Sequence, residues 1–313
     1  MDYKKIIAES WEFTQNNKKL IRWLGFFPGL FTTTFGVGYM TYQFFAFKSS
    51  YIFSDGEDHF LFDVLGTIWD FISGHVSLTM PLIVVTVVLA IIYLLFPTLA
   101  MAAAIQVISR KRNGQDASVG TGLRYGLMTY LPLLEYHIII KTFTVFSILT
   151  EMSFVVRNLG PVIFKLLLPV FIVAFVIGII LTLLFTYADF YIVIDKKGVI
   201  ESMKASAKLV ITNWMHTFLI TLLMLIIGVR VIIQAFLVFL IPVLIIVVSG
   251  YIATVTLPVT SIVIGGAAGV VALVVASYIT GVVDIFAYAV WTFTFLEFTS
   301  QKEVSARESV GQA

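Results

Sequence analysis

The stretch "DKKGVIESMKASAKLVITNWMHTFLI", residues 195–220, is a charged segment between two long apolar runs. Neither the run before it, 166–188, nor the run from 209 to 229 contains Asp, Glu, Lys or Arg. Each run is long enough to cross a bilayer as a helix, which takes about 20 residues. Within the charged segment, Lys204 and Lys208 are four residues apart, and apolar residues follow a different stripe: Val199, Met203 and Val210. The pattern predicts an amphipathic helix at a membrane surface, between two membrane-spanning helices.

The composition of the whole chain fits the same class of protein. Its 313 residues are 59% hydrophobic and only 12% charged, whereas a soluble domain carries about 25% charged residues. Three further runs without Asp, Glu, Lys or Arg are long enough to span a bilayer: 23–47, 71–109 and 231–283. Backbone polar groups in lipid must find partners within their own segment, so each span should be helical. The sequence therefore predicts an all-α, polytopic membrane protein.

Basic residues collect in alternate connections between the predicted spans. Fifteen of the 20 Lys and Arg residues fall on one side of the predicted membrane. Because cytoplasmic loops of membrane proteins are enriched in Lys and Arg, this side is predicted to be cytoplasmic. The opposite side carries the acidic segment 48–75, so both termini are predicted to be cytoplasmic and the number of spans even. We predict six spans in three hairpins: 23–47, 76–106, 129–150, 162–188, 213–240 and 265–296. The uncharged region 231–283 allows either two long helices or an additional re-entrant pair.

A common layout recurs three times along the chain. Residues 6–20, 119–133 and 199–213 mix polar and apolar residues at helical spacing and lead into a predicted span. They predict three interfacial helices within a single membrane domain, 1–313, built from three modules: 1–112, 113–195 and 196–313. Lys and Arg reach lipid headgroups and Trp favours the interface, so the candidate lipid contacts are Trp11, Lys18, Lys19, Trp23, Arg124, Lys204, Lys208 and Trp214. These helices either engage lipids or partner proteins, or only fix depth and orientation.

The run 187–228 carries a family resemblance. It reads "YADFYIVIDKKGVIESMKASAKLVITNWMHTFLITLLMLIIG" and resembles the membrane domain that precedes the catalytic part of some glycerophosphodiester phosphodiesterases, and its stand-alone six-span relatives. A loop Asp, a Ser on the following helix and an Asn-Trp pair carry the resemblance: Asp195, Ser206, Asn213 and Trp214. It implies a six-span fold in a bacterial cytoplasmic membrane. It implies no reaction, because the phosphodiesterase part has no counterpart here and the stand-alone relatives have no agreed activity.

Four ionisable residues predict a polar site inside the membrane. His137 and Lys141 lie one helical turn apart in the third predicted span, Glu135 lies nearer its cytoplasmic end, and Asp284 lies near the middle of the sixth. Charged side chains in lipid are costly and face the protein interior or water. We expect Lys141 to pair with Asp284, with His137 beside them. The pair would serve a proton or substrate path, or it would only hold two hairpins together; alternatively, Lys141 reaches the interface alone.

Motifs that would indicate an enzyme are missing from the sequence. It has no phosphate-binding loop, no H-E-x-x-H, no G-x-S-x-G and no cysteine. The acidic segment 48–75 matches neither the spacing of an EF-hand nor that of a zinc site. We therefore predict a non-enzymatic membrane module that engages lipids or partner proteins, without metal, cofactor or nucleic acid. The alternative is a small transporter or channel that uses the polar face of the third and sixth spans.

Pairs of glycines four residues apart predict close helix packing. They occur at Gly25 and Gly29, at Gly122 and Gly126, and at Gly265 and Gly269. Such spacing lets two helices approach closely. Packing within the chain is the expected role, and self-association through Gly265 and Gly269 is the alternative for that pair.

Overall fold

The computed structural model is helical throughout the residues that it describes, which are 2–48, 66, 69–70, 72–74, 76–141, 143–229 and 258–311. No strand occurs among them. In chain order the elements are α1 (Tyr3–Asn16), α2 (Lys18–Leu20), the π-helical turn η1 (Ile21–Phe26), α3 (Phe27–Lys48), α5 (Val76–Arg112), α6 (Val119–Lys141), α7 (Val145–Asn158), α8 (Gly160–Leu184), α9 (Ala188–Val193), α10 (Val199–Thr212), the helix Trp214–Val229, and α12 (Pro258–Gly311). Most of segment 48–75 and the first half of region 231–283 lie outside the described residues.

Several described helices are long and apolar enough to cross a membrane. By length and composition these are Thr79–Arg112, Gly160–Leu184 and Gly266–Ser300. A fourth span results if α10 and the helix Trp214–Val229, which meet at 97°, are counted as one bent unit. The all-helical class is therefore confirmed, and the helices indicate a membrane protein. The arrangement of six spans in three hairpins stays a prediction.

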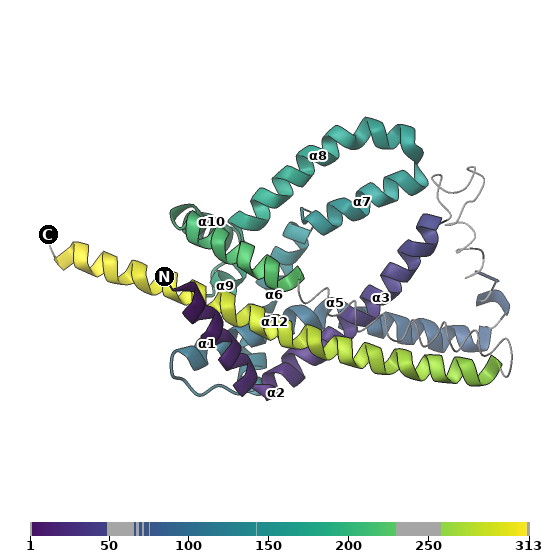
Figure 1. The fold of residues 1–313 in the computed structure, drawn as a ribbon, viewed down its shortest axis with the longest axis horizontal. Helices are drawn as coiled ribbons and strands as arrows, with labels where there is room; N and C mark the ends of the chain where they lie inside the picture. Colours follow the sequence, from purple (N-terminus) through teal and green to yellow (C-terminus); the bar gives the residue numbers. More distant parts are fainter. Residues whose placement is uncertain are drawn as a thin grey trace.

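The core lies where α1, α5, α6, α9 and α10 meet α12, a region that we call the packed end. Two clusters of buried apolar residues form it, one joining α1, α2, η1, α5 and α12, the other joining α5, α6, α9, α10 and α12. Figure 1 shows α1 crossing α12 there, with α9 and α10 near it. From the packed end, α5 and α12 extend side by side, while α7 and α8 form a hairpin that leads away from them.

The two halves of α5 lie in different surroundings. Towards the packed end, the chain "AMAAAIQVI", residues 100–108, is almost completely buried. Its alanines have small side chains, so neighbouring helices can come close. The other half exposes apolar side chains on every face, among them Met80, Leu82, Val84, Val87 and Ile91. A helix that is apolar all round needs an apolar environment on all sides, which a bilayer provides for this half.

Glycines of α6 bring that helix against α5. A Cβ added at Gly122 would lie 2.8 Å from the carbonyl oxygen of Ala103, and one added at Gly126 would lie 3.0 Å from its backbone nitrogen. Both distances are too short for a side chain to fit without movement of α5. The predicted pair therefore packs within the chain, as expected.

The glycine pair near the N-terminus does the same against α12. A Cβ at Gly25 would lie 2.5 Å from the carbonyl oxygen of Gly281, and one at Gly29 would lie 2.9 Å from that of Ser277. In contrast, no atom of the described residues lies within 4 Å of a Cβ built at Gly269. The first two glycine pairs thus hold helices together, whereas Gly269 has no close neighbour within the described part of the chain.

The third predicted span, 129–150, consists of two helices. α6 ends at Lys141, and α7 begins after Thr144, whose hydroxyl accepts a hydrogen bond from the N–H of Ser147 at 3.4 Å. Gly178 of α8 packs on this break, because a Cβ there would lie 2.4 Å from the carbonyl oxygen of Phe143. The predicted interfacial helix 119–133 is not separate either, since it forms the first part of α6.

α1 and α10, the other two predicted interfacial helices, end in the same way. Each has 14 residues and stops at an asparagine, Asn17 or Asn213. The side-chain amide of Asn17 donates to the carbonyl of Phe13 at 2.7 Å, and that of Asn213 donates to Leu209 at 3.1 Å. The asparagine thus satisfies a carbonyl that the end of a helix leaves without a partner. In both places the next helix begins one residue later.

Candidate functional site

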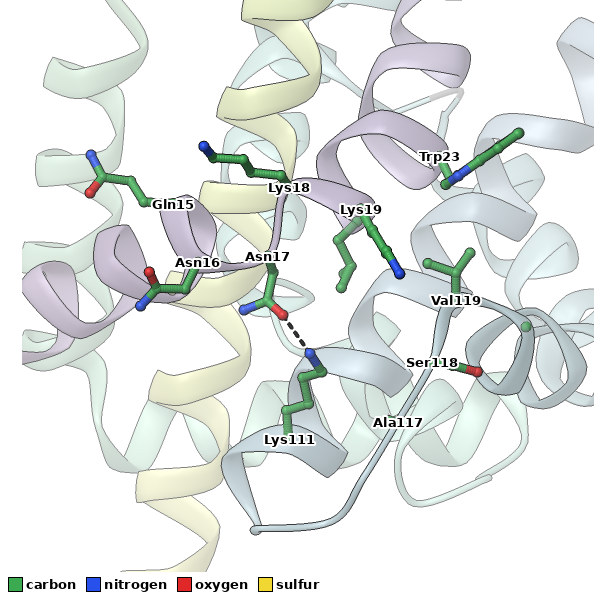
Figure 2. A pocket seen from close by; sticks show the side chains of 12 residues that line it. Gln15, Asn16, Asn17, Lys18, Lys19, Trp23, Lys111, Ala117, Ser118 and Val119 are labelled. Atoms are coloured by element: carbon green, nitrogen blue, oxygen red, sulfur yellow. Dashed lines mark hydrogen bonds between the residues drawn. The ribbon is translucent and has the colours of Figure 1, made fainter.

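A cavity of about 650 Å³ opens at the packed end, between the end of α1 and the start of α6 (Figure 2). Its polar lining comes from Asn16, Asn17, Lys18, Lys19 and Lys111, and the segment 117–120 closes the opposite side. Trp23 stands at its edge. We call this cavity the basic pocket.

Asn17 organises one wall of the basic pocket. Its side-chain nitrogen donates to the carbonyl of Phe13 and ends α1, so the chain turns and Lys18 starts the next helix. Its side-chain oxygen accepts a hydrogen bond from the ammonium group of Lys111, drawn as a dashed line in Figure 2. The same figure shows Lys19 pointing towards the start of α6, whereas Lys18 points away from it. Asn17 therefore connects two segments that lie 94 residues apart.

The charge in the basic pocket is positive. Three lysines and no Asp or Glu occur among the described residues that line it. The start of α6 adds backbone N–H groups, because the first N–H groups of a helix have no partner within it. One of them, the N–H of Thr121, already donates to the hydroxyl of Ser118 at 3.2 Å. A helix N-terminus also carries partial positive charge. Such a concavity is suited to an anion with several oxygen acceptors, such as a phosphate group.

The predicted lipid contacts are all on the surface. The exposed fractions of Trp11, Trp23 and Trp214 are 45%, 52% and 62%. The Trp23 ring stacks on Phe27 with a centroid distance of 5.2 Å. The basic members are exposed as well: Lys18, Lys19, Arg124, Lys204 and Lys208. Of the eight, Lys18, Lys19 and Trp23 line the basic pocket, and the others stand elsewhere on the surface.

The predicted intramembrane site has a different partner from the expected one. His137 lies 3.1 Å from the carboxylate of Asp189 on α9, measured from Nε2 to Oδ1. Asp284 has no ion pair or hydrogen bond among the described residues, and Glu135 is exposed. The side chain of Lys141 lies outside the described residues, so the Lys141–Asp284 pair stays a prediction.

Asp189 is the functional candidate that the sequence reading missed. It lies close enough to Tyr136 and Tyr288 to act on both hydroxyl groups electrostatically, and Asp284 acts on Tyr288 as well. His137 and these residues therefore form one polar neighbourhood between α6, α9 and α12. The signal in the sequence was a single Asp directly after the uncharged run 166–188.

Together, the long apolar helices, the basic pocket and the polar neighbourhood define an α-helical membrane protein with polar sites between its helices. The chain belongs to the family described as "Domain of unknown function (DUF7847)", whose profile matches residues 60–296. The match includes His137, Asp189 and Asp284 and one side of the basic pocket, but it begins after Lys18, Lys19 and Trp23. No curated protein and no solved structure matches the chain.

Proposed function

We propose that the chain is a non-enzymatic membrane module that engages anionic lipids through the basic pocket. The observation that carries this proposal is the cavity of about 650 Å³ lined by three lysines, with no acidic residue among the described residues of its lining. The proposal includes six spans in three hairpins, both termini in the cytoplasm and a bacterial cytoplasmic membrane as location. These follow from the distribution of charge and from the resemblance to the membrane domain of glycerophosphodiester phosphodiesterases.

The proposed topology puts the basic pocket at the level of lipid headgroups. The exposed Trp23 at its edge favours that level, because amphipathic rings collect at the membrane–water interface. Each basic residue near an anionic leaflet contributes about 1 kcal/mol at moderate salt. Lys18 and Lys19 together therefore contribute about 2 kcal/mol, which corresponds to a preference of about 30-fold for anionic over zwitterionic lipid.

The test compares two variants that lose the same charge. Purified protein in mild detergent is titrated with phosphatidylglycerol or phosphatidylethanolamine, and bound lipid is counted by native mass spectrometry. We expect Lys18→Gln with Lys19→Gln to lose about 30-fold in affinity for phosphatidylglycerol. Lys4→Gln with Lys5→Gln, exposed on α1, outside the pocket and not among the predicted lipid contacts, is the control and should stay within about threefold. Equal losses in the two double variants would refute a role for the pocket.

A second candidate function is a small transporter or channel. It is favoured by the polar neighbourhood in which His137, Asp189 and Asp284 come from three different helices. A flux assay in proteoliposomes distinguishes it from the lipid module, because only a transporter moves solute across the bilayer.

Self-association is a further part of the proposal. Gly265 and Gly269 are four residues apart on α12, and the space beside Gly269 is open within the described chain. A second copy packing there would bring two α12 helices into close contact. Crosslinking of Gly269→Cys in a membrane, against Gly114→Cys as control, tests it.

A further inference from the structure

The lysines of the basic pocket do not all face the same way. In Figure 2 the side chain of Lys19 points towards the start of α6, whereas that of Lys18 points away from it. The ammonium group of Lys111 is held by its hydrogen bond to Asn17. An ammonium group has three N–H donors, so Lys111 keeps two of them for a ligand. Lys19 and Lys111 therefore supply the two full charges that a ligand between α2 and α6 would meet.

The start of α6 contributes donors from the opposite wall. Val119 and Gly120 line the pocket and lie in the first turn of α6, where backbone N–H groups have no partner within the helix. The N-terminus of a helix also carries about half a positive charge. Gly120 leaves room for a ligand, because the only atom of the described residues within 4 Å of a Cβ built there is the hydroxyl oxygen of Ser118, at 3.9 Å.

No negative charge offsets these groups. Among the described residues that line the pocket there is no Asp, Glu or His. Two acidic residues come from the neighbouring segments: Glu9 pairs with Arg112, and Asp116 is exposed and does not line the pocket. A ligand would therefore meet two ammonium groups and about half a charge from the helix, with the third lysine directed away.

This charge fits one class of phosphate better than the other. A phosphodiester headgroup has a single negative charge and two terminal oxygens, whereas a phosphomonoester has a charge of about −1.5 to −2 at pH 7 and three such oxygens. We propose that the basic pocket recognises a phosphomonoester and that its ligand is a lipid of the phosphatidic acid class. This inference rests on the proposed function and adds the identity of the headgroup. Trp23 at the edge of the pocket favours a lipid as the source, because exposed tryptophan collects at the membrane interface.

The experiment compares phosphatidic acid with phosphatidylglycerol of the same acyl chains. Each lipid is titrated onto the purified protein in mild detergent at pH 8 and at pH 5, and bound lipid is counted by native mass spectrometry. We expect phosphatidic acid to bind at least about tenfold more tightly at pH 8. The ratio should fall to about twofold at pH 5, because the second proton of a phosphomonoester binds with a pKa of about 6. The lysines stay charged over this range, so the change in the ratio belongs to the ligand.

Two neighbouring lysines provide matched variants. Lys19→Gln removes a charge that faces α6 and should lower the ratio at pH 8 to about threefold or less. Lys18→Gln removes the same charge from a side chain that points away and should keep the ratio within about twofold of the wild type. Both lysines are exposed, so both variants should fold. Lys19→Arg keeps the charge and should keep the preference for phosphatidic acid.

Three results would overturn the proposal: equal affinities for the two lipids at pH 8, a ratio that is the same at both pH values, and equal effects of Lys19→Gln and Lys18→Gln on the ratio. If the two lipids bind equally well but Lys18→Gln with Lys19→Gln weakens both, the lipid function stands and only the headgroup assignment fails. Glycerol 3-phosphate tests the source of the phosphate. A lipid ligand predicts that it does not displace phosphatidic acid at millimolar concentration, and displacement at the concentrations at which the lipid binds would identify a soluble phosphomonoester instead.

Discussion

Replacing Ser206 with alanine tests how α10 is held at the packed end. The Ser206 side chain is buried, and its hydroxyl makes two hydrogen bonds to the segment that joins α8 to α9. It donates to the carbonyl of Leu184 at 2.8 Å and accepts the N–H of Tyr187 at 3.0 Å. Alanine leaves both backbone groups without this partner. A buried polar group without a partner costs about 1–3 kcal/mol, so the two together should lower the free energy of unfolding by about 2–4 kcal/mol after relaxation.

Ser202, one turn earlier on the same helix, gives the matched control. It is also fully buried, but its hydroxyl has no hydrogen-bond partner among the described residues. Ser202→Ala makes the same chemical change and removes a buried group that is not satisfied, so stability should stay equal or rise slightly. The measurement is reversible unfolding by SDS titration in mixed micelles, followed by circular dichroism. Equal destabilisation of the two variants would refute the hydrogen-bond argument and point to packing of the serine side chains instead.

Three further predictions concern other parts of the packed end. Gly281→Ala puts a Cβ 2.5 Å from the backbone of Gly25 and should cost about 1–3 kcal/mol in the same titration. Gly269→Ala on the same helix meets no atom of the described residues within 4 Å and should gain up to about 1 kcal/mol. Asn213→Ala removes the hydrogen bond that ends α10 and should cost about 1 kcal/mol, and an unchanged unfolding curve would contradict a capping role. Burial raises the pKa of the Tyr187 hydroxyl. The protonated hydroxyl therefore makes its full contribution to stability below about pH 10, and this contribution is lost as the pH rises through the folded-state pKa. The difference in ultraviolet absorbance between the wild type and Tyr187→Phe, followed during a pH titration, should therefore show ionisation of Tyr187 only when the protein unfolds at alkaline pH. Ionisation near pH 10 in the folded protein would show that the Tyr187 hydroxyl is not buried.

The local pattern of α10 could be predicted from the sequence, and its end could be explained from one residue. The polar and apolar stripes predict a helix over 199–213, and the structure has Val199–Thr212. The same reading extends α1 to residue 20, whereas the helix ends at Asn16. Asn17 stops α1 because its side chain satisfies a carbonyl near the helix end. The residues after it, "KKL", continue the helical pattern, so periodicity alone does not reveal the stop.

Features that depend on distant segments could not be predicted in the same way. No proline or glycine lies in residues 142–144, yet α6 ends at Lys141 and α7 begins only at Val145. Between them, Gly178 of α8 packs on the carbonyl of Phe143. The basic pocket needs Asn17 and Lys111, which are far apart in the sequence. One sequence without related sequences carries no signal for such pairs. The interfacial pattern predicts Lys18, Lys19 and Trp23 of the pocket lining, whereas it gives no reason to place Lys111 beside them.

Hydropathy also fails to distinguish a helix surface that faces lipid from one that faces protein. Both halves of α5 are apolar, but residues 100–108 are buried by other helices and residues 80–95 are mostly exposed. The difference lies in side-chain size, because small alanines dominate the buried half and large branched residues dominate the other. Without a hydrophobic force between helices in lipid, close packing through small residues is what holds them together. Side-chain size along an apolar run therefore predicts the packed part better than hydropathy does.

The contacts that hold α1 explain why an anion in the basic pocket would matter for the fold. Apolar contacts join α1 to α12, such as Trp11 on Phe286 with a centroid distance of 5.6 Å. Towards α5, polar contacts hold α1 and the residue after it, because Arg112 pairs with Glu9 and Lys111 with Asn17. Like charges in a pocket repel one another, and an anion between them removes that repulsion. The pocket is lined by the end of α1 on one side and by α5 and α6 on the other. A bound lipid phosphate would therefore stabilise the docking of α1. The docking of α1 would increase the affinity for that phosphate by the same free energy.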